Sequence, residues 1–129
     1  MDDKRLNNRP LVLIRGAGEQ ASGVGWAFSK AGFRVLMTEV PEPLMVRWPV
    51  CFGTAIEKGE WQVEEITACR VNSFGSECAN AWEAGKIPVL VDPELNSLAQ
   101  LEPCVLVDAI MAKRNLGTRR GMAPLTIGL

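Results

Sequence analysis

LVLIRGAGEQASGVGWAFSKAGFRVLMTE, residues 11–39, is the stretch that decides the fold of this chain. Residues 11–14 form an unbroken apolar run, which is typical of a parallel strand buried on both faces. A glycine turn follows, and then residues 21–31 show the three- and four-residue apolar spacing of an amphipathic helix. Gly32 stands where a helix is expected to stop, and residues 33–37 indicate a second strand. The stretch therefore predicts a βαβ unit. The helix face expected to pack on the sheet contains Val24, Ala27, Phe28 and Ala31.

The turn between the first strand and the helix matches a phosphate-binding pattern. Gly16, Gly18 and Ala21 give G-x-G-x-x-A, in which the first glycine makes the turn and the second lets a pyrophosphate approach the backbone. The helix N-terminus would face the anion. Glu39 follows Gly18 by 21 residues, about where an acid accepts hydrogen bonds from a ribose. Glu19 opposes this reading, because a carboxylate in the turn repels a phosphate unless it points outward. The alternative is a tight turn that binds no ligand.

Composition places the chain among ordinary globular domains. It has 129 residues, 47% of them hydrophobic and 22% charged, with a net charge of −1. We expect one α/β domain over residues 11–129, preceded by a loose lead-in at residues 1–10. No basic surface indicates nucleic acid, no apolar run is long enough to cross a membrane, and the acidic start does not resemble a signal peptide. A cytoplasmic protein with reduced cysteines is the expectation.

The chain contains no histidine and no tyrosine, which excludes Ser-His-Asp and Cys-His catalysis within it. Its four cysteines form no C-x-x-C pair, so no metal site is predicted. Cys69, Cys78 and Cys104 occupy apolar positions and are expected in the core. Cys51 lies in a loop region and is the one candidate for a reactive thiol. No catalytic residue is assigned.

The rest of the chain continues the α/β pattern. We expect short helices at 52–58 and 95–101, a hairpin within 61–71, a helix over 73–84 capped by Ser73, and strands at 87–91, 104–107 and 123–129. The predicted fold is a Rossmann-like parallel sheet with helices on both faces and a small β-hairpin insertion. The apolar last strand makes a homo-oligomer plausible.

Two of these strands end in an aspartate, Asp92 and Asp108. The carboxyl edge of an open α/β sheet is where such folds bind ligands, so both are candidates for the site. A helix or turn cap is the alternative for each of them. Arg47 and Trp48 follow the second strand and bring a cation and an aromatic ring to the same edge, although a tryptophan such as Trp48 more often packs as a lid on the core than it stacks on a base.

A basic loop follows Asp108. Four cations stand within residues 113–120, and they suit an anionic ligand, although a solvated charge cluster is the alternative. They are Lys113, Arg114, Arg119 and Arg120.

Long segments of the chain resemble one family. LVLIRGAGEQASGVGWAFSKAGFRVLMTEVPEPLMVRWPVCF, IPVLVDPE and VLVDAIMAKRNLGTRRGMAPLTIGL look like the YqeB-type accessory proteins of selenium-dependent molybdenum hydroxylases. The resemblance implies a role in molybdenum-cofactor maturation, with the hydroxylase apo-enzyme as partner and molybdopterin cytosine dinucleotide as a candidate cofactor. It also implies that family members are roughly twice as long as this chain, which would then correspond to an amino-terminal half.

The family's recurring segments coincide with the edge described above. The predicted cofactor-binding residues are Gly16, Gly18, Ala21, Glu39, Arg47, Asp92, Asp108, Lys113, Arg114, Asn115, Thr118 and Arg119. Three other functions remain open: an NAD(P)-binding oxidoreductase domain, a selenium-handling enzyme that uses Cys51 as nucleophile, and a non-catalytic dimerisation domain.

Overall fold

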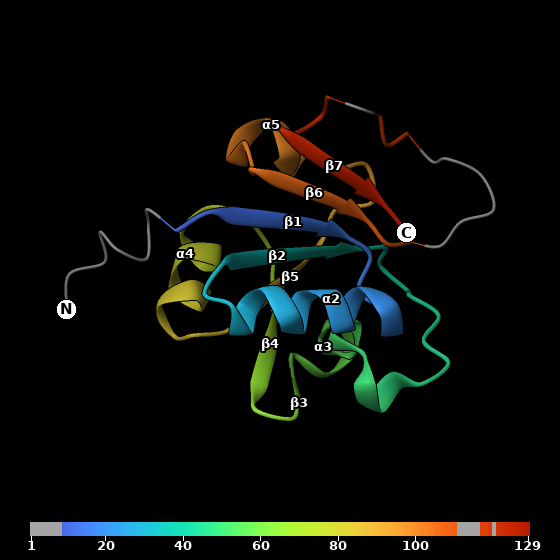
Figure 1. Cartoon of the computed structure of the whole chain (residues 1–129). Coiled ribbons are helices and arrows are strands. Elements are labelled where there is room, and N and C mark those ends of the chain that lie inside the picture. The colour runs from blue at the N-terminus through green and yellow to red at the C-terminus, as the bar shows by residue number, and fades with distance from the viewer. Residues whose placement is uncertain (1–8, 111–116, 120) are drawn as a thin grey trace.

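A computed structural model describes residues 9–110, 117–119 and 121–129, which form one seven-stranded sheet (Figure 1). The strand order is β3-β4-β5-β2-β1-β6-β7. All neighbours run parallel except β3 and β4, which form an antiparallel hairpin. The Rossmann-like α/β prediction and its hairpin are confirmed. The strands are β1 (Leu11–Arg15), β2 (Arg34–Glu39), β3 (Glu60–Val63), β4 (Ile66–Val71), β5 (Ile87–Val91), β6 (Val105–Asp108) and β7 (Leu125–Gly128).

Helices cover both faces of the sheet. On one face, α2 (Glu19–Lys30) and α3 (Ala55–Lys58) bury Ala21 and Ile56 against β1, β2, β4 and β5. On the other, α4 (Ser76–Glu83) and α5 (Ser97–Leu101) cover a second core that contains Trp82. Two 3₁₀ turns, η1 (Trp48–Val50) and η2 (Phe52–Thr54), lead into α3. None of the helices in the described part of the chain is long and apolar enough to cross a membrane.

The inner face of α2 differs from the expected one. The helix begins at Glu19, two residues early, and the residues it buries are Ala21, Ser22 and Gly25. Ala27 and Ala31, expected inside, are exposed. A Cβ on Gly25 would lie 3.0 Å from the Met37 sulfur. Small residues therefore face the sheet because helix and strand approach closely, which apolar spacing alone does not reveal.

The predicted cap of α4 was also wrong. The helix begins at Ser76 with Gly75 as its N-cap, and not at Ser73. The Ser73 hydroxyl donates to Glu77 Oε1 at 3.3 Å, which joins the preceding loop to the first turn of the helix.

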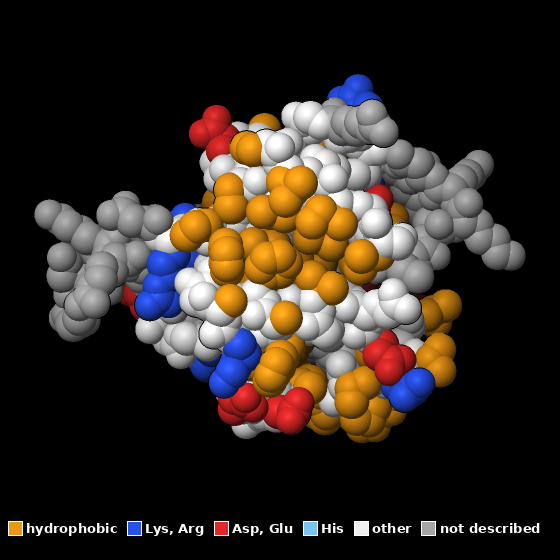
Figure 2. All heavy atoms as spheres, viewed as in Figure 1, with side chains coloured by type: hydrophobic (Ala, Val, Ile, Leu, Met, Phe, Trp, Pro, Cys, Tyr) orange, Lys and Arg blue, Asp and Glu red, His pale blue; other side chains and the backbone are white. Residues whose placement is uncertain are grey.

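Hydrophobic side chains gather on the α2 face of the sheet above β1, β6 and β7 (Figure 2). Leu125 of β7 lies beside Val105 in the parallel register, and Ile127 lies beside Val107. Leu125 is 52% exposed, whereas Val105 and Ile127 are partly buried against the core. This end of the sheet thus presents an apolar surface.

Burial of Cys78 predicts a loss of stability in alkali. Desolvation raises the pKa of its thiol to about 12, from an ordinary value of 9.0, and its side chain is fully buried. The unfolded chain releases this proton above about pH 9 while the folded chain keeps it. The contribution is therefore intact below that pH and is lost toward pH 12, by at most about 1.4 kcal/mol per pH unit. Urea unfolding between about pH 8 and pH 11 should show a steeper decline for the native chain than for Cys78→Ala. Parallel declines would contradict this.

Candidate functional site

A cavity of about 540 Å³ opens at the carboxyl ends of β1 and β2. Gly18, which follows β1, and Ala109, which follows β6, both line it. In the sheet, β2 lies on one side of β1 and β6 lies on the other. The strand order therefore reverses at β1, and the cavity lies at this point. Ligands of open α/β sheets bind at this point.

The three small residues of the glycine turn have different environments. Gly16 has φ of +112°, and a Cβ there would lie 2.9 Å from the Ala109 carbonyl oxygen. Gly18 has φ of −77° and is the N-cap of α2, with no side chain capping the helix. No atom lies within 4 Å of the position of a Gly18 Cβ. Ala21 is completely buried between helix and sheet. Gly16 therefore shapes the turn, while Gly18 leaves its backbone open to the cavity.

The peptide groups of Ala17 fix the turn from two sides. Its N–H donates to Glu39 Oε1 at 2.9 Å. Its carbonyl accepts from the Gly53 N–H at 2.9 Å and from the Ser22 hydroxyl at 3.2 Å. The Ser22 oxygen in turn accepts from the Phe52 N–H at 2.7 Å. The η2 segment thus docks on the glycine turn, a contact that sequence reasoning missed because it joins residues about thirty positions apart.

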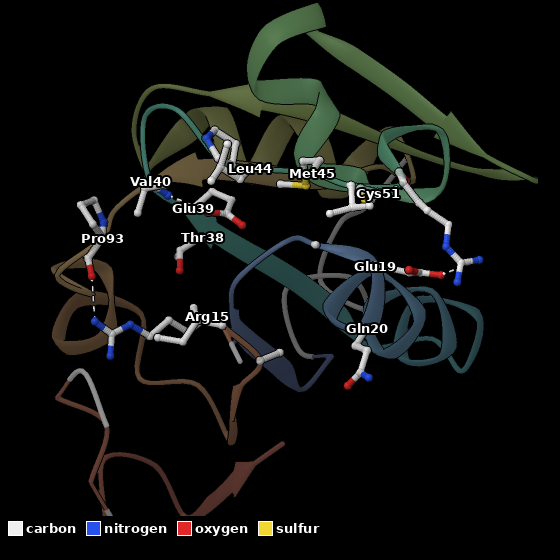
Figure 3. A pocket seen from close by; sticks show the side chains of 16 residues that line it. Arg15, Glu19, Gln20, Thr38, Glu39, Val40, Leu44, Met45, Cys51 and Pro93 are labelled. Carbon is white, nitrogen blue, oxygen red and sulfur yellow. Dashed lines mark hydrogen bonds and ion pairs between the residues drawn. The ribbon is translucent and has the colours of Figure 1, made fainter. Parts of the chain in front are cut away.

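Glu39 ends β2 and faces the cavity (Figure 3). Its second carboxylate oxygen accepts from the Val40 N–H at 2.9 Å. Each oxygen of a carboxylate has two lone pairs, so both retain capacity for a ligand hydroxyl. Glu39 therefore helps to hold the turn and can still act as the acid that was predicted to bind a ribose.

Arg15 supplies a buried cation that the sequence analysis missed. It is the last residue of β1 and only 8% exposed, and it lines the cavity. Its Nη1 donates to Thr118 Oγ1 at 3.0 Å, and its Nη2 donates to the Pro93 carbonyl at 2.8 Å (Figure 3). No salt bridge joins Arg15 to any residue within the described ranges. The signal that was available was its place directly before the glycine turn.

Arg47 offsets the charge that Glu19 brings to the turn. Its Nη1 lies 3.3 Å from Glu19 Oε2, and this ion pair stands at the cavity wall, with Arg47 72% exposed and Glu19 47% exposed (Figure 3). Exposed ion pairs add at most about 1 kcal/mol, so the pair can separate when a ligand arrives. Arg47 thus reaches the cavity as predicted from the sequence.

The two strand-end aspartates do not line the cavity. Asp92 is 5% exposed, and its carboxylate accepts from the Asn96 N–H, the Ser97 N–H and the Ser97 hydroxyl at 2.6–2.8 Å. Within the described part of the chain, Asp108 Oδ1 accepts from the Ile110 N–H at 3.3 Å. Asp92 therefore caps the start of α5, which was the alternative to a role in the site.

Cys51 is buried, contrary to the loop position expected for a reactive thiol. It is 1% exposed, and its Sγ lies 3.2 Å from the Arg47 carbonyl. Burial raises the pKa of the Cys51 thiol, and the charges of Glu19 and Glu39 raise it further. A nucleophilic thiol needs the opposite environment.

The basic loop falls largely outside the described residues. The predicted site residues Lys113, Arg114 and Asn115 lie outside them, and so does the fourth cation, Arg120. Thr118 reaches the site through Arg15, and Arg119 is exposed. Among the residues that the structure describes, no group of three or more cysteine or acidic side chains is placed to hold a metal ion.

The fold and the cavity define a Rossmann-like α/β protein with a glycine turn at the switch point of its sheet. The chain is 50% identical over its whole length to YqeB of Escherichia coli (strain K12), which is described only as an uncharacterized protein. The resemblance to YqeB-type proteins is thereby supported. The chain spans 24% of that relative, so the expectation of a half-length match was wrong for it. No family model matches the chain, and no solved structure does.

Proposed function

We propose that this chain binds a nucleotide-bearing cofactor of the molybdopterin-dinucleotide type, as part of an accessory protein that matures selenium-dependent molybdenum hydroxylases. The observation that carries the binding proposal is Gly18. Its backbone stands uncapped at the N-terminus of α2 and opens into a cavity of about 540 Å³, with free space where a side chain would be. The maturation role and the apo-hydroxylase as partner rest on the resemblance to YqeB-type proteins. A cytoplasmic location is proposed together with them.

Each group at the turn has a part in this proposal. The N–H groups at the start of α2 would bind a phosphate, with the helix dipole adding to the attraction. Glu39 would accept from a ribose hydroxyl. Arg15 in the cavity wall, Arg47 at its rim, and the basic loop with Lys113, Arg114 and Arg119 would balance the remaining negative charge.

An NAD(P)-binding oxidoreductase domain is the second candidate. The G-x-G-x-x-A turn and the acid at the end of β2 favour it, because dinucleotide-binding domains use the same two features. The absence of histidine and tyrosine opposes it, since this chain would have to use another acid for proton transfer.

A ligand panel separates the two candidates. It contains molybdopterin cytosine dinucleotide, CTP, NAD(H), NADP(H) and FAD, and is read by thermal shift and then by calorimetry. A ligand at about 100 times its dissociation constant adds about 2.7 kcal/mol to the free energy of unfolding. Binding of the molybdenum dinucleotide supports the maturation role, binding of a nicotinamide nucleotide alone supports the oxidoreductase, and no binding contradicts both.

Gly18→Val should weaken binding of the nucleotide found in this panel by about tenfold or more, because the valine would fill the space that the phosphate needs. The backbone accepts the change, since φ is −77° and no atom lies within 4 Å of the new Cβ. Calorimetric titration measures the effect.

Gly75→Val is the matched control. Gly75 is also a helix N-cap with φ of −86° and open space around its Cβ position, but it is absent from the cavity lining. Unchanged affinity in Gly18→Val, or an equal loss in both variants, would sink the assignment.

A further inference from the structure

A second cavity of about 630 Å³ lies on the other side of residues 41–45. Pro43 and Met45 line both cavities, so this segment is the wall between them. Met45 packs its methyl group over Gly53, where a Cβ would collide with it. The glycine turn contributes nothing to the second cavity, which is lined instead by residues of the η1–α3 region and by Arg70 of β4.

Cations and carboxylates meet around this cavity. The Arg70 guanidinium donates from Nη1 to the Ile56 carbonyl at 2.9 Å, and none of the described residues forms a salt bridge with it. Its other N–H groups are therefore free of carboxylate partners in this part of the chain. Lys58 and Glu57 are 3.7 Å apart and largely exposed, so their pairing is weak. Glu42 adds a second carboxylate to the lining.

An aromatic ring completes the lining. Trp48 is 48% exposed and packs against Trp61, with the ring centroids 5.3 Å apart. The Trp61 indole N–H donates to the Pro49 carbonyl at 2.9 Å, which fixes the pair. A half-exposed, anchored indole offers a surface on which a planar ring can stack.

We propose that this second cavity binds a 2-amino-4-oxo heterocycle, the ring system shared by guanine and the pterins. Such a ring presents an amino group and a ring N–H side by side, which a carboxylate accepts in two parallel hydrogen bonds. It also carries a carbonyl oxygen, which Arg70 or Lys58 can bind as donors. Its planar face suits Trp48. Adenine has no carbonyl oxygen, so it offers neither Arg70 nor Lys58 this acceptor.

This inference rests on the proposed function for one point only, that the ring belongs to the ligand whose phosphate binds at the glycine turn. Pro43 and Met45 line both cavities, so the two cavities are neighbours. Binding of the isolated ring to the second cavity does not depend on it.

The test compares two fluorescent probes that differ at one position. Pterin-6-carboxylate has an amino group at carbon 2, whereas lumazine-6-carboxylate has a carbonyl there. Fluorescence titration of the whole chain should show pterin binding about tenfold tighter, because the lumazine carbonyl would face a carboxylate. Glu57→Gln and Glu42→Gln are measured separately, and one of them should remove most of this discrimination. Trp48→Leu and Arg70→Gln should each weaken binding of pterin by about fivefold or more.

Gly18→Val and Gly75→Val should bind pterin as the native chain does. Glu57→Gln should leave the fold intact, since the Glu57 side chain is 80% exposed, and circular dichroism checks the fold of the other variants. Absence of pterin binding, equal affinity for the two probes, or loss of pterin binding in Gly18→Val would each overturn the inference. If pterin binds as expected while every nucleotide of the panel fails, the proposed function falls and the second cavity stands.

Discussion

Gly16→Ala is expected to lower the free energy of unfolding by about 3 to 5 kcal/mol. Two separate costs add at this position. With φ of +112°, the backbone is in a region that an L-residue with a side chain rarely adopts. The new Cβ would also lie 2.9 Å from the Ala109 carbonyl oxygen and 3.2 Å from Ile110 Cγ2. A backbone oxygen cannot rotate away as a side chain can, so β1 or the end of β6 must move.

Gly32→Ala is the control that separates these costs. Gly32 has φ of +96°, but no atom lies within 4 Å of its Cβ position. Its substitution therefore carries the backbone cost alone, about 1 to 2 kcal/mol. Urea unfolding with linear extrapolation measures both variants. Equal losses would mean that the approach of Ala109 is not a real constraint on the turn.

The turn at Gly16 shows why the βαβ unit could be predicted from the sequence. An apolar run, a glycine turn and an amphipathic helix are local patterns, and each is set by residues a few positions apart. The strands at 87–91 and 104–107 and the hairpin within 61–71 could be predicted for the same reason, and the structure places them as expected, apart from end positions.

The candidate site was less readable because its contacts are long-range. Arg15 and Thr118 are 103 residues apart, and only the return of the chain past β6 brings them together. Ser22 was expected on no particular face of its helix, yet it holds both the glycine turn and η2. Hydrophobic spacing cannot identify such a residue, since its burial depends on a hydrogen-bonding partner from another segment.

The role of the loop after β2 could not be predicted from the sequence. Residues 41–46 contain two prolines, and no regular element is predicted for them. The structure makes part of this segment a wall between two cavities, while Leu44 and Val46 are 99% and 98% exposed. Apolar side chains held in water next to a cavity are available to contact a ligand or partner, whereas those of the core are not.

Asp92→Ala is expected to lower the free energy of unfolding by about 3 kcal/mol. The carboxylate is 95% buried, as its exposed fraction is 5%, and it accepts three hydrogen bonds, from two backbone N–H groups and the Ser97 hydroxyl. Alanine would leave these donors at the start of α5 without a partner. Hydrogen bonds to charged groups contribute about 1.5 to 3 kcal/mol, and the three share one carboxylate, so their loss is not additive.

Asp108→Ala is the matched control, because Asp108 also stands at the end of a strand but is half-buried, and within the described residues its carboxylate accepts only the Ile110 N–H, at 3.3 Å. Its loss should cost less than about 1 kcal/mol. Urea unfolding of both variants, together with calorimetric titration of the nucleotide found in the ligand panel, separates the two roles that the sequence left open. A large loss of stability with unchanged affinity for Asp92→Ala makes this acid a cap. A loss of affinity without a loss of stability would mean that Asp92 contacts the ligand. In that case α5 would have to move when the ligand binds.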